Sequence, residues 1–390
     1  MKRVLLLLSL VPLSMPLWAG YGYYRPITVS HTMVSTTLGN NSLSNFTVYV
    51  QLSGTTFKSV ANGGHLGASG NQGTVNGQTV PYDLIFATSS ACSTNFGNWE
   101  IGSWDPVNGV IEAWIRVSSL SYSANTVFYA CYGNTAIVGF QGGAVGTAWD
   151  SNYKGVYHFG TASTLSLADS TSNGNNLNHP GSSISAVAGI AGGALYHVTA
   201  SDPVTVAAAV TGFPATLESW YYPTNYANNP VLLGLFTAST YSNNLYSQNS
   251  GSTAGQVTLT CNAGTTDLLA GPTWTSAANN AWHDVVAIGS SATNWSLIVD
   301  AVVYGPDTTS CSPSFDHLSI GITDWGGGNY QYPMGYDYAD EVRLSNIARS
   351  YDWIITGYNN LHSLSTYVTV GSEGTPTGGT TSVTLTPIIL

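Results

Sequence analysis

Apolar and polar residues alternate with a period of two along much of the chain. In residues 111–117 the odd positions are apolar, whereas Glu112 and Arg116 fall on the other face, which is typical of a strand buried on one side. The same alternation predicts strands at residues 47–52, 127–131, 217–221, 285–288 and 296–299. Asp300 and Ala301 then predict a hairpin turn that returns through residues 302–304, although Ala301 replaces the Gly that such turns prefer.

Helical periodicity is almost absent. Ser350 is a potential N-cap for a helix over residues 351–355, and Gly357 predicts that this helix stops after at most two turns. Many short strands separated by Gly, Asn and Ser favour antiparallel sheets, because a parallel sheet would need alternating helices. The predicted fold class is therefore all-β, with two antiparallel β-sandwich domains.

The first residues have the pattern of a secretory signal peptide. Lys2 and Arg3 precede an apolar run, and Ala19 offers a small residue for cleavage before Gly20. The competing interpretation is a membrane anchor, but the run is short for a span of about 20 residues, and no later segment is long and apolar enough. We expect residues 1–19 to be removed and the protein to be secreted, either extracellular or on the cell surface.

Two changes in composition divide the rest of the chain. The Gly-rich stretch 139–146 indicates a connection between domains. The stretch after residue 371 has the composition of a flexible linker. The predicted domains are residues 20–140 and 145–371. Residues 372–390 are then a flexible tail or the start of a missing β domain.

The charge of the chain argues against nucleic acid as a partner. Only 7% of the residues are charged, with 8 Lys and Arg against 19 Asp and Glu and a net charge of −11. Nucleic-acid binding depends on Lys and Arg that neutralise phosphates, so this chain is not expected to bind nucleic acid. Its 24 Tyr and 11 Trp nevertheless supply enough apolar surface for a folded core.

The four cysteines are expected to form disulfides, because export favours them. Of the three possible connectivities we favour Cys92 with Cys131 and Cys261 with Cys311, since a domain boundary near residue 140 would otherwise be bridged twice. The alternative is four buried, reduced thiols. None of the spacings is that of a zinc site.

Several segments resemble known families. Residues 24–31, 81–86, 114–117 and 129–134 resemble the bacterial domain of unknown function 2341, whereas residues 149–159, 169–175, 282–286 and 340–346 resemble laminin-G-like, concanavalin-A-like modules of secreted bacterial proteins. The resemblance covers about residues 21–371. It implies that the second domain is a jelly roll of a kind often described as lectin-like, whereas the first family has no assigned activity.

Catalytic signatures are largely missing. The sequence contains no serine-hydrolase elbow, zinc-protease motif or phosphate-binding loop, and its five Glu do not have the spacing of the jelly-roll glucanases. Asp337, Asp340 and Glu341 form the densest acidic group, but Asp340 and Glu341 are adjacent and should alternate sides of a strand. His158, His283 and His317 are scattered, which favours packing roles, so no catalytic residue is assigned.

A structural Ca²⁺ site is a more plausible use of the acidic residues. Calcium prefers carboxylate and carbonyl oxygens, and the candidate ligands are Asp169, beside an Asn- and Gly-rich turn, and Asp340, at the start of a late strand. They could meet if the module closes as a jelly roll. The alternative is that they are an unrelated turn residue and strand-end residue.

The candidate ligand loop combines aromatic and polar side chains in a Gly-rich stretch. Sugar rings stack on Trp and Tyr, while Asp and Asn bind sugar hydroxyls. The residues proposed for this role are Asp324, Trp325, Asn329, Tyr330 and Tyr332. The alternative is that these aromatics cover a sandwich edge.

The sequence thus favours a non-catalytic binding or adhesion protein whose partner is a glycan or another cell-surface component. A structural spacer in a larger surface protein is the second hypothesis, and a glycoside hydrolase is the third.

Overall fold

The computed structural model describes most of the chain after residue 19. The described ranges are 20–35, 39–179, 183–198, 204–207, 210–224, 231–236, 245–250, 254–261, 266–311, 315–321, 323–324, 330–331 and 336–377. The predicted signal peptide, residues 1–19, and residues 378–390 of the predicted tail lie outside these ranges.

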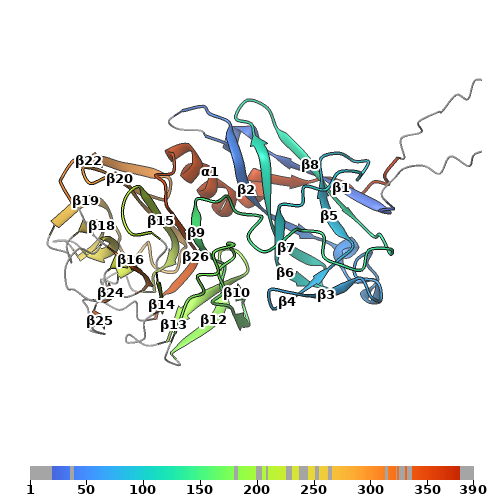
Figure 1. The fold of residues 1–390 in the computed structure, drawn as a ribbon, viewed down its shortest axis with the longest axis horizontal. Helices are drawn as coiled ribbons and strands as arrows, with labels where there is room; N and C mark the ends of the chain where they lie inside the picture. The colour runs from blue at the N-terminus through green and yellow to red at the C-terminus, as the bar shows by residue number, and fades with distance from the viewer. Residues whose placement is uncertain are drawn as a thin grey trace, which may run out of the picture.

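The protein is all-β and consists of antiparallel sheets stacked as two sandwiches, as predicted (Figure 1). One sheet of the N-terminal sandwich has the strand order β27-β1-β8-β5, and the facing sheet has the order β2-β7-β6. Their bounds are Tyr23–Val29 for β1, Leu43–Ser53 for β2, Leu84–Ala87 for β5, Trp99–Asp105 for β6, Val110–Leu120 for β7, Thr126–Tyr132 for β8 and Val368–Val370 for β27. A hairpin of β3 (Gln72–Val75) and β4 (Gln78–Pro81) pairs only with itself.

The second sandwich is the jelly roll. Its larger sheet has the order β12-β13-β26-β15-β20-β21-β22, with β9 also paired to β26, and its smaller sheet has the order β14-β23-β16-β17-β18-β19. The larger sheet comprises β9 (Tyr153–Tyr157), β12 (Ile184–Ala188), β13 (Gly193–His197), β15 (Ala215–Tyr222), β20 (His283–Ser291), β21 (Asn294–Val299), β22 (Val302–Asp307) and β26 (Tyr338–Ser345). The smaller sheet comprises β14 (Val204–Ala207), β16 (Val231–Phe236), β17 (Leu245–Ser250), β18 (Ala254–Cys261), β19 (Thr266–Thr273) and β23 (His317–Ile320).

Short elements complete the described fold. Two further hairpins join β10 (Gly160–Thr161) to β11 (Thr164–Leu165) and β24 (Thr323–Asp324) to β25 (Tyr330–Gln331). The helices are α1 (Tyr351–His362) and α2 (Leu364–Tyr367), and three 3₁₀ turns lie at His31–Met33, Thr55–Phe57 and Val60–Asn62.

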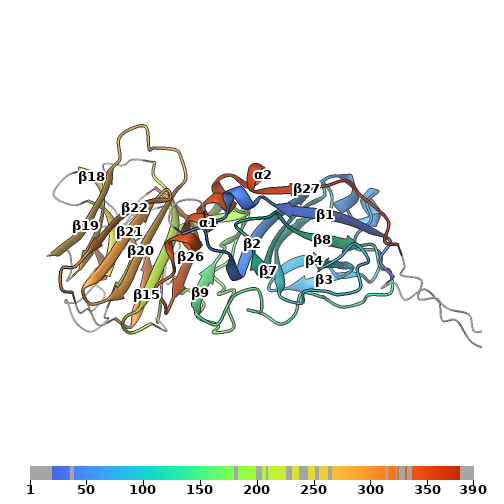
Figure 2. The ribbon, with the colours of Figure 1, turned by 90° about the horizontal axis from the view of Figure 1, so that it is seen from above.

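The last strand of the chain belongs to the first sandwich, which corrects the predicted extent of the second domain. β27 pairs with β1, matching Ile27 to Val370 and Val29 to Val368. Beyond β27, Gly374 forms a bridge with Tyr24. The jelly roll is therefore inserted between β8 and β27, and Figure 2 shows α2 and β27 running back alongside β1. Residues 368–371 were expected in the jelly roll and residue 374 in a free tail.

Helix α1 begins where predicted but is longer. The Ser350 hydroxyl accepts the N–H of Trp353 as an N-cap. Gly357 does not end the helix; it lies inside it, at a point where an added Cβ would be 4.0 Å from both Arg343 Nη1 and Glu218 Oε1. Packing of α1 against the jelly-roll sheet thus outweighs the weak helix propensity of glycine.

Both disulfides have the predicted connectivity. Cys92 is bonded to Cys131 with a Cα–Cα distance of 5.9 Å, and Cys261 is bonded to Cys311 with a Cα–Cα distance of 6.4 Å. The first lies in the core of the N-terminal sandwich and the second in that of the jelly roll.

A separate hydrophobic cluster joins the two sandwiches. Trp114 and Tyr49 from the N-terminal sandwich pack with Trp149 and Trp220, and Leu361 of α1 closes the group. Asn360 of α1 adds two hydrogen bonds to the backbone of Tyr49. The outer face of the larger jelly-roll sheet is therefore covered by α1 and by the neighbouring domain, as Figure 1 shows at their junction.

Candidate functional site

The predicted ligand loop is only partly described. Asp324 pairs with Tyr330 across the β24–β25 hairpin, but no side chain of this hairpin is described. Trp325, Asn329 and Tyr332 lie outside the described residues. The aromatic cluster proposed there stays a prediction.

The two predicted calcium ligands have separate sets of hydrogen-bond donors. The Asp340 carboxylate accepts the N–H groups of Ala191 and Glu341, whereas Asp169 accepts donors from its own turn and from β9. Within the described ranges, no group of three or more His, Cys, Asp or Glu side chains is arranged to hold a metal ion. Calcium binding stays a prediction.

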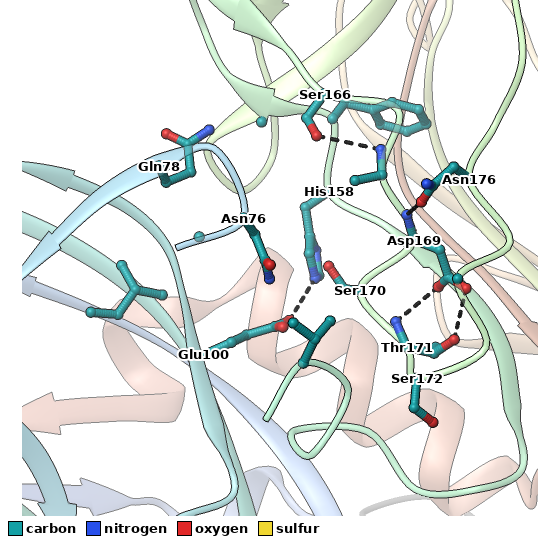
Figure 3. A pocket seen from close by; sticks show the side chains of 17 residues that line it. Asn76, Gln78, Glu100, His158, Ser166, Asp169, Ser170, Thr171, Ser172 and Asn176 are labelled. Carbon is teal, nitrogen blue, oxygen red and sulfur yellow. Dashed lines mark hydrogen bonds and ion pairs between the residues drawn. The ribbon is translucent and has the colours of Figure 1, made fainter. Parts of the chain in front are cut away.

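A polar pocket lies where the two sandwiches meet (Figure 3). Its volume is about 440 Å³, within the range of ordinary ligand pockets. The N-terminal sandwich contributes the tip of the β3–β4 hairpin and β6, and the jelly roll contributes the end of β9 and the segment 166–176. The lining residues with polar side chains are Asn76, Gln78, Glu100, His158, Ser166, Asp169, Ser170, Thr171, Ser172 and Asn176.

The hairpin tip places two carboxamides on one wall. Asn76 and Gly77 both have positive φ, at 50° and 79°, which is the geometry of the tight hairpin turns that Asn-Gly favours. Among the described residues, the side chains of Asn76 and Gln78 have no hydrogen-bond partner. Both amides can therefore donate to and accept from a ligand.

The opposite wall carries hydroxyl groups. Ser170 is half-buried and Ser172 is exposed, and neither side chain has a partner among the described residues. In Figure 3 Asn76 and Ser170 lie on either side of His158. Among the described residues, the pocket thus has two unpaired amides on the wall of the N-terminal sandwich and two unpaired hydroxyls on the wall of the jelly roll.

At the base of the pocket, His158 forms ion pairs that connect the two domains. His158 Nε2 lies 3.1 Å from Glu100 Oε1, and His158 Nδ1 lies 2.7 Å from Glu341 Oε1. Burial alone would lower the pKa of His158, but the charges and hydrogen bonds of Glu341 and Glu100 outweigh it and raise this pKa to about 10. His158 is therefore an imidazolium at neutral pH, with both nitrogens donating.

Other groups fix this bridge in place. The His158 ring stacks on Trp114 at a centroid distance of 4.7 Å. The Trp149 indole N–H donates to Glu100 Oε1 at 2.8 Å. With both nitrogens bonded to carboxylates, His158 has no free position from which to act as a general base.

The charges continue from the bridge into the interface. Arg343 pairs with Glu341 at 2.9 Å and with Glu218 at 2.8 Å. Asp284 lies at the end of this group, and neither of its oxygens has a hydrogen-bond partner. Burial, followed by the charges of Glu218 and Asp300, raises the pKa of Asp284 well above its usual range.

A β-bulge brings Glu341 into this group. Glu341 has a φ of 49°, and the register of β15 against β26 shifts between Glu218 and Trp220. The simple alternation expected of Asp340 and Glu341 is therefore wrong. Bulges commonly redirect a side chain beside a site.

The pocket is suited to an uncharged, hydrogen-bonding ligand. The described residues that line it include no Lys or Arg, the charge of Glu100 is balanced by His158, and the Asp169 carboxylate is occupied by N–H donors. Apolar surface comes from Ile101 and the exposed Val145. Phe159 is the one Phe, Tyr or Trp among the described lining residues, and it is buried. A sugar ring therefore cannot stack on an exposed Phe, Tyr or Trp ring of these residues.

Sequence reasoning missed most of this pocket. Asn76, Gln78, Glu100 and Ser170 had no assigned role, and His158 was assigned to packing. The Asn-Gly pair at residue 76 and the Asn- and Gly-rich turn after Asp169 were visible signals. That they face one another follows only from domain docking.

Comparisons with known proteins give limited similarity. No family model matches the chain, and no curated protein matches it. Among solved structures, domain 4 of AbnA, a GH43 extracellular arabinanase from Geobacillus stearothermophilus solved with arabinotriose, is 15% identical with a TM-score of 0.44, covering 53% of this chain and 98% of that one.

Two others are similar over a smaller share of their length. The botulinum neurotoxin serotype D binding domain is 9% identical with a TM-score of 0.39, covering 53% of this chain and 51% of that one. A Trypanosoma rangeli sialidase is 12% identical with a TM-score of 0.40, covering 65% and 41%. Similarity at this level does not indicate a function.

In the described part of the chain, no helix is both long and apolar enough to cross a membrane.

Proposed function

We propose that this protein is an exported glycan-binding protein that holds a neutral saccharide in the pocket between its two sandwiches. The observation that carries the proposal is that one pocket is lined by two amides, Asn76 and Gln78, and by the hydroxyls of Ser170 and Ser172, all four without a hydrogen-bond partner among the described residues. Sugar hydroxyls both donate and accept, and so do these four groups. Asn76 and Ser172 are exposed and Gln78 and Ser170 are half-buried, so a saccharide would take the place of water on these groups.

Charge supports a neutral ligand. The chain has a net charge of −11, which repels acidic glycans at long range. Phosphorylated or sulfated sugars also need Lys or Arg partners, and the described part of the pocket lining contains none. The signal-peptide pattern and the two disulfides support export, where such ligands are met.

We propose that the ligand is bound without being hydrolysed. Glycoside hydrolysis normally needs two carboxyl groups available on either side of the scissile bond. In this pocket Asp169 accepts hydrogen bonds at both oxygens, and Glu100 is bonded to Trp149 and His158. Asp169 is thus occupied at both oxygens and Glu100 at Oε1.

A structural spacer is the second candidate. The insertion of the jelly roll between β8 and β27 and the bonded interface fix the two domains together, as a rigid spacer would require. A spacer needs no ligand, so a binding measurement separates the two proposals.

The test is a glycan array probed with the protein lacking residues 1–19, followed by titration of the best neutral ligand. Each of Asn76→Ala and Ser170→Ala removes one hydrogen-bonding group and should weaken binding about 3- to 10-fold. Thr79→Ala, an exposed residue of the same hairpin outside the lining, is the matched control. Absence of binding to any glycan favours the spacer, and release of reducing sugar would establish a hydrolase.

A further inference from the structure

The wall that carries Ser170 and Ser172 is shaped by one buried carboxylate. We infer that Asp169 is a positioning residue of the pocket, which holds the two seryl hydroxyls in place by binding the surrounding backbone. This inference rests on the proposed function, because it assigns Asp169 a part in binding the saccharide. It also gives this residue a role other than that of a calcium ligand.

The hydrogen bonds of Asp169 tie the turn to the strand that precedes it. Oδ1 accepts the N–H of Val156 in β9 at 3.1 Å and the N–H of Thr171 at 2.8 Å. Oδ2 accepts the Thr171 hydroxyl at 2.8 Å and the N–H of Asn175 at 2.9 Å. The side chain is almost fully buried, at 5% exposure, so water does not compete for these bonds.

The location of these bonds connects them to the ligand wall. Ser170 and Ser172 flank Thr171, whose N–H and hydroxyl both bind Asp169. The bond from Val156 anchors the turn two residues before His158, at the base of the pocket. A change at Asp169 therefore moves both hydroxyls relative to the opposite wall, where Asn76 lies.

The chemistry requires a carboxylate and not an amide. All four partners are donors, and both oxygens of an aspartate accept. In Asp169→Asn one oxygen becomes an NH₂ group, which would face donors at one side of the turn. The shape of the side chain is kept while the hydrogen bonds on that side are lost.

The hydrogen bonds that Asp169 accepts compete with its predicted role as a calcium ligand. A calcium ion on Asp169 would have to displace N–H donors that already occupy its oxygens. If Asp169 positions the wall, glycan binding should not change on adding a chelator. If Asp169 holds calcium, chelation and Asp169→Asn should weaken binding alike.

The experiment is a double-mutant cycle between Asp169→Asn and Ser170→Ala, measured by titration with the best neutral glycan. Asp169→Asn should weaken binding at least 10-fold. Because it acts through Ser170, adding Ser170→Ala should cost clearly less in the Asp169→Asn background than in the wild type. The matched control is Asp105→Asn, since Asp105 caps a turn through the N–H groups of Val107 and Asn108 outside the pocket.

Hydrogen exchange supplies a readout that needs no glycan. In Asp169→Asn the amides of Thr171 and Asn175 should exchange faster, while those of β1 and β8 stay protected. Should Asp169→Asn fail to fold, Thr171→Val removes the hydroxyl bond to Asp169 and the two bonds that this hydroxyl accepts from Asn173. It keeps the backbone bonds of Asp169 and should weaken binding to a smaller extent.

The outcomes separate the two proposals. Weakened binding in Ser170→Ala with unchanged binding in Asp169→Asn overturns the positioning role but leaves the pocket. Additive effects of Asp169→Asn and Ser170→Ala also overturn it. Unchanged binding in both Asn76→Ala and Ser170→Ala refutes the pocket itself, even if exchange in the turn is faster.

Discussion

Asp83 is a fully buried carboxyl with an unused oxygen. Its Oδ1 accepts the N–H of Gly67 at 2.9 Å, whereas Oδ2 has no partner. Burial raises the pKa of Asp83 to about 6 from 3.8. The folded state therefore keeps this proton at a pH where the unfolded state has lost it, and the free energy of unfolding should decrease as pH rises from about 4 to about 6.

Asp83→Asn should remove this dependence. The variant should match the wild type near pH 4 and be more stable by up to roughly 3 kcal/mol at pH 7, at about 1.4 kcal/mol per pKa unit. Urea unfolding at both pH values measures the difference. A wild type that is equally or more stable than the variant at pH 7 would contradict the account.

Ala301 offers a second prediction at the residue scale. It occupies the turn between β21 and β22 with a φ of 64°, a region that costs a non-glycine residue roughly 1–2 kcal/mol. Ala301→Gly should stabilise the protein by about 0.5–1 kcal/mol, since glycine's extra freedom in the unfolded state offsets part of the gain.

The control for this change is Ala292→Gly in the neighbouring turn, where φ is not positive. It should destabilise slightly. Thermal unfolding of the two variants should therefore shift in opposite directions, and a shift in the same direction would show that backbone strain is not the cause.

Single residues were predictable where the cause is local. The Ser350 cap and the Asp300–Ala301 turn depend on neighbours in sequence, and both are found. The Glu100–His158 contact joins residues from two domains, and no local pattern indicates it. The role of His158 was therefore missed.

Among the strands and helices, β27 is the one that ties the C-terminal part of the chain to the N-terminal sandwich. It supplies an edge strand to the N-terminal sandwich, and Tyr367 just before it is fully buried in that core. A chain ending at residue 350 lacks α1, α2 and β27. We expect such a chain to lose the cooperative unfolding of both domains, because β1 and the interface cluster lose their partners.

Calorimetry and near-ultraviolet circular dichroism would compare the unfolding of two chains, residues 20–350 and residues 20–377. A truncated chain in which the N-terminal sandwich unfolds cooperatively at the temperature of the longer one would refute the interlocked arrangement. Deleting residues 378–390 alone is the control and should have little effect.

Elements with regular alternation were predictable because one face of each is buried. The strands at residues 111–117 and 217–221 fall inside β7 and β15 as expected. The full length of α1 was not predictable, because it depends on contacts with β2 and with Arg343. The pairing of β27 with β1 was not predictable either, since it joins opposite ends of the chain.

At the scale of the whole molecule, His158 links the domains. His158→Gln leaves Glu100 and Glu341 buried without their shared cation, which should cost about 3–5 kcal/mol at pH 7. Because the raised pKa of His158 lies near 10, its stabilisation is complete below about pH 6.5 and is lost as pH rises through about 10.

The stability difference between wild type and His158→Gln should therefore shrink between pH 7 and pH 10. His362→Gln, at an exposed position on α1, is the control and should be nearly neutral. A difference that does not change with pH would show that packing on Trp114, and not charge, accounts for the effect.

Two sandwiches could be predicted from alternation and composition, but their docking could not. The pocket is formed by that docking, because its walls come from segments that are about 90 residues apart in sequence, around Asn76 and Ser170. The scarcity of Lys and Arg in the composition favours the neutral ligand that we propose.

A crystal structure of the protein with the best neutral oligosaccharide from the array would test whether a neutral saccharide binds between the domains. We expect sugar density in the pocket, with hydroxyls within hydrogen-bond distance of Asn76 or Gln78 on one side and of Ser170 or Ser172 on the other. Density only at the β24–β25 hairpin, with the pocket filled by water, would contradict it.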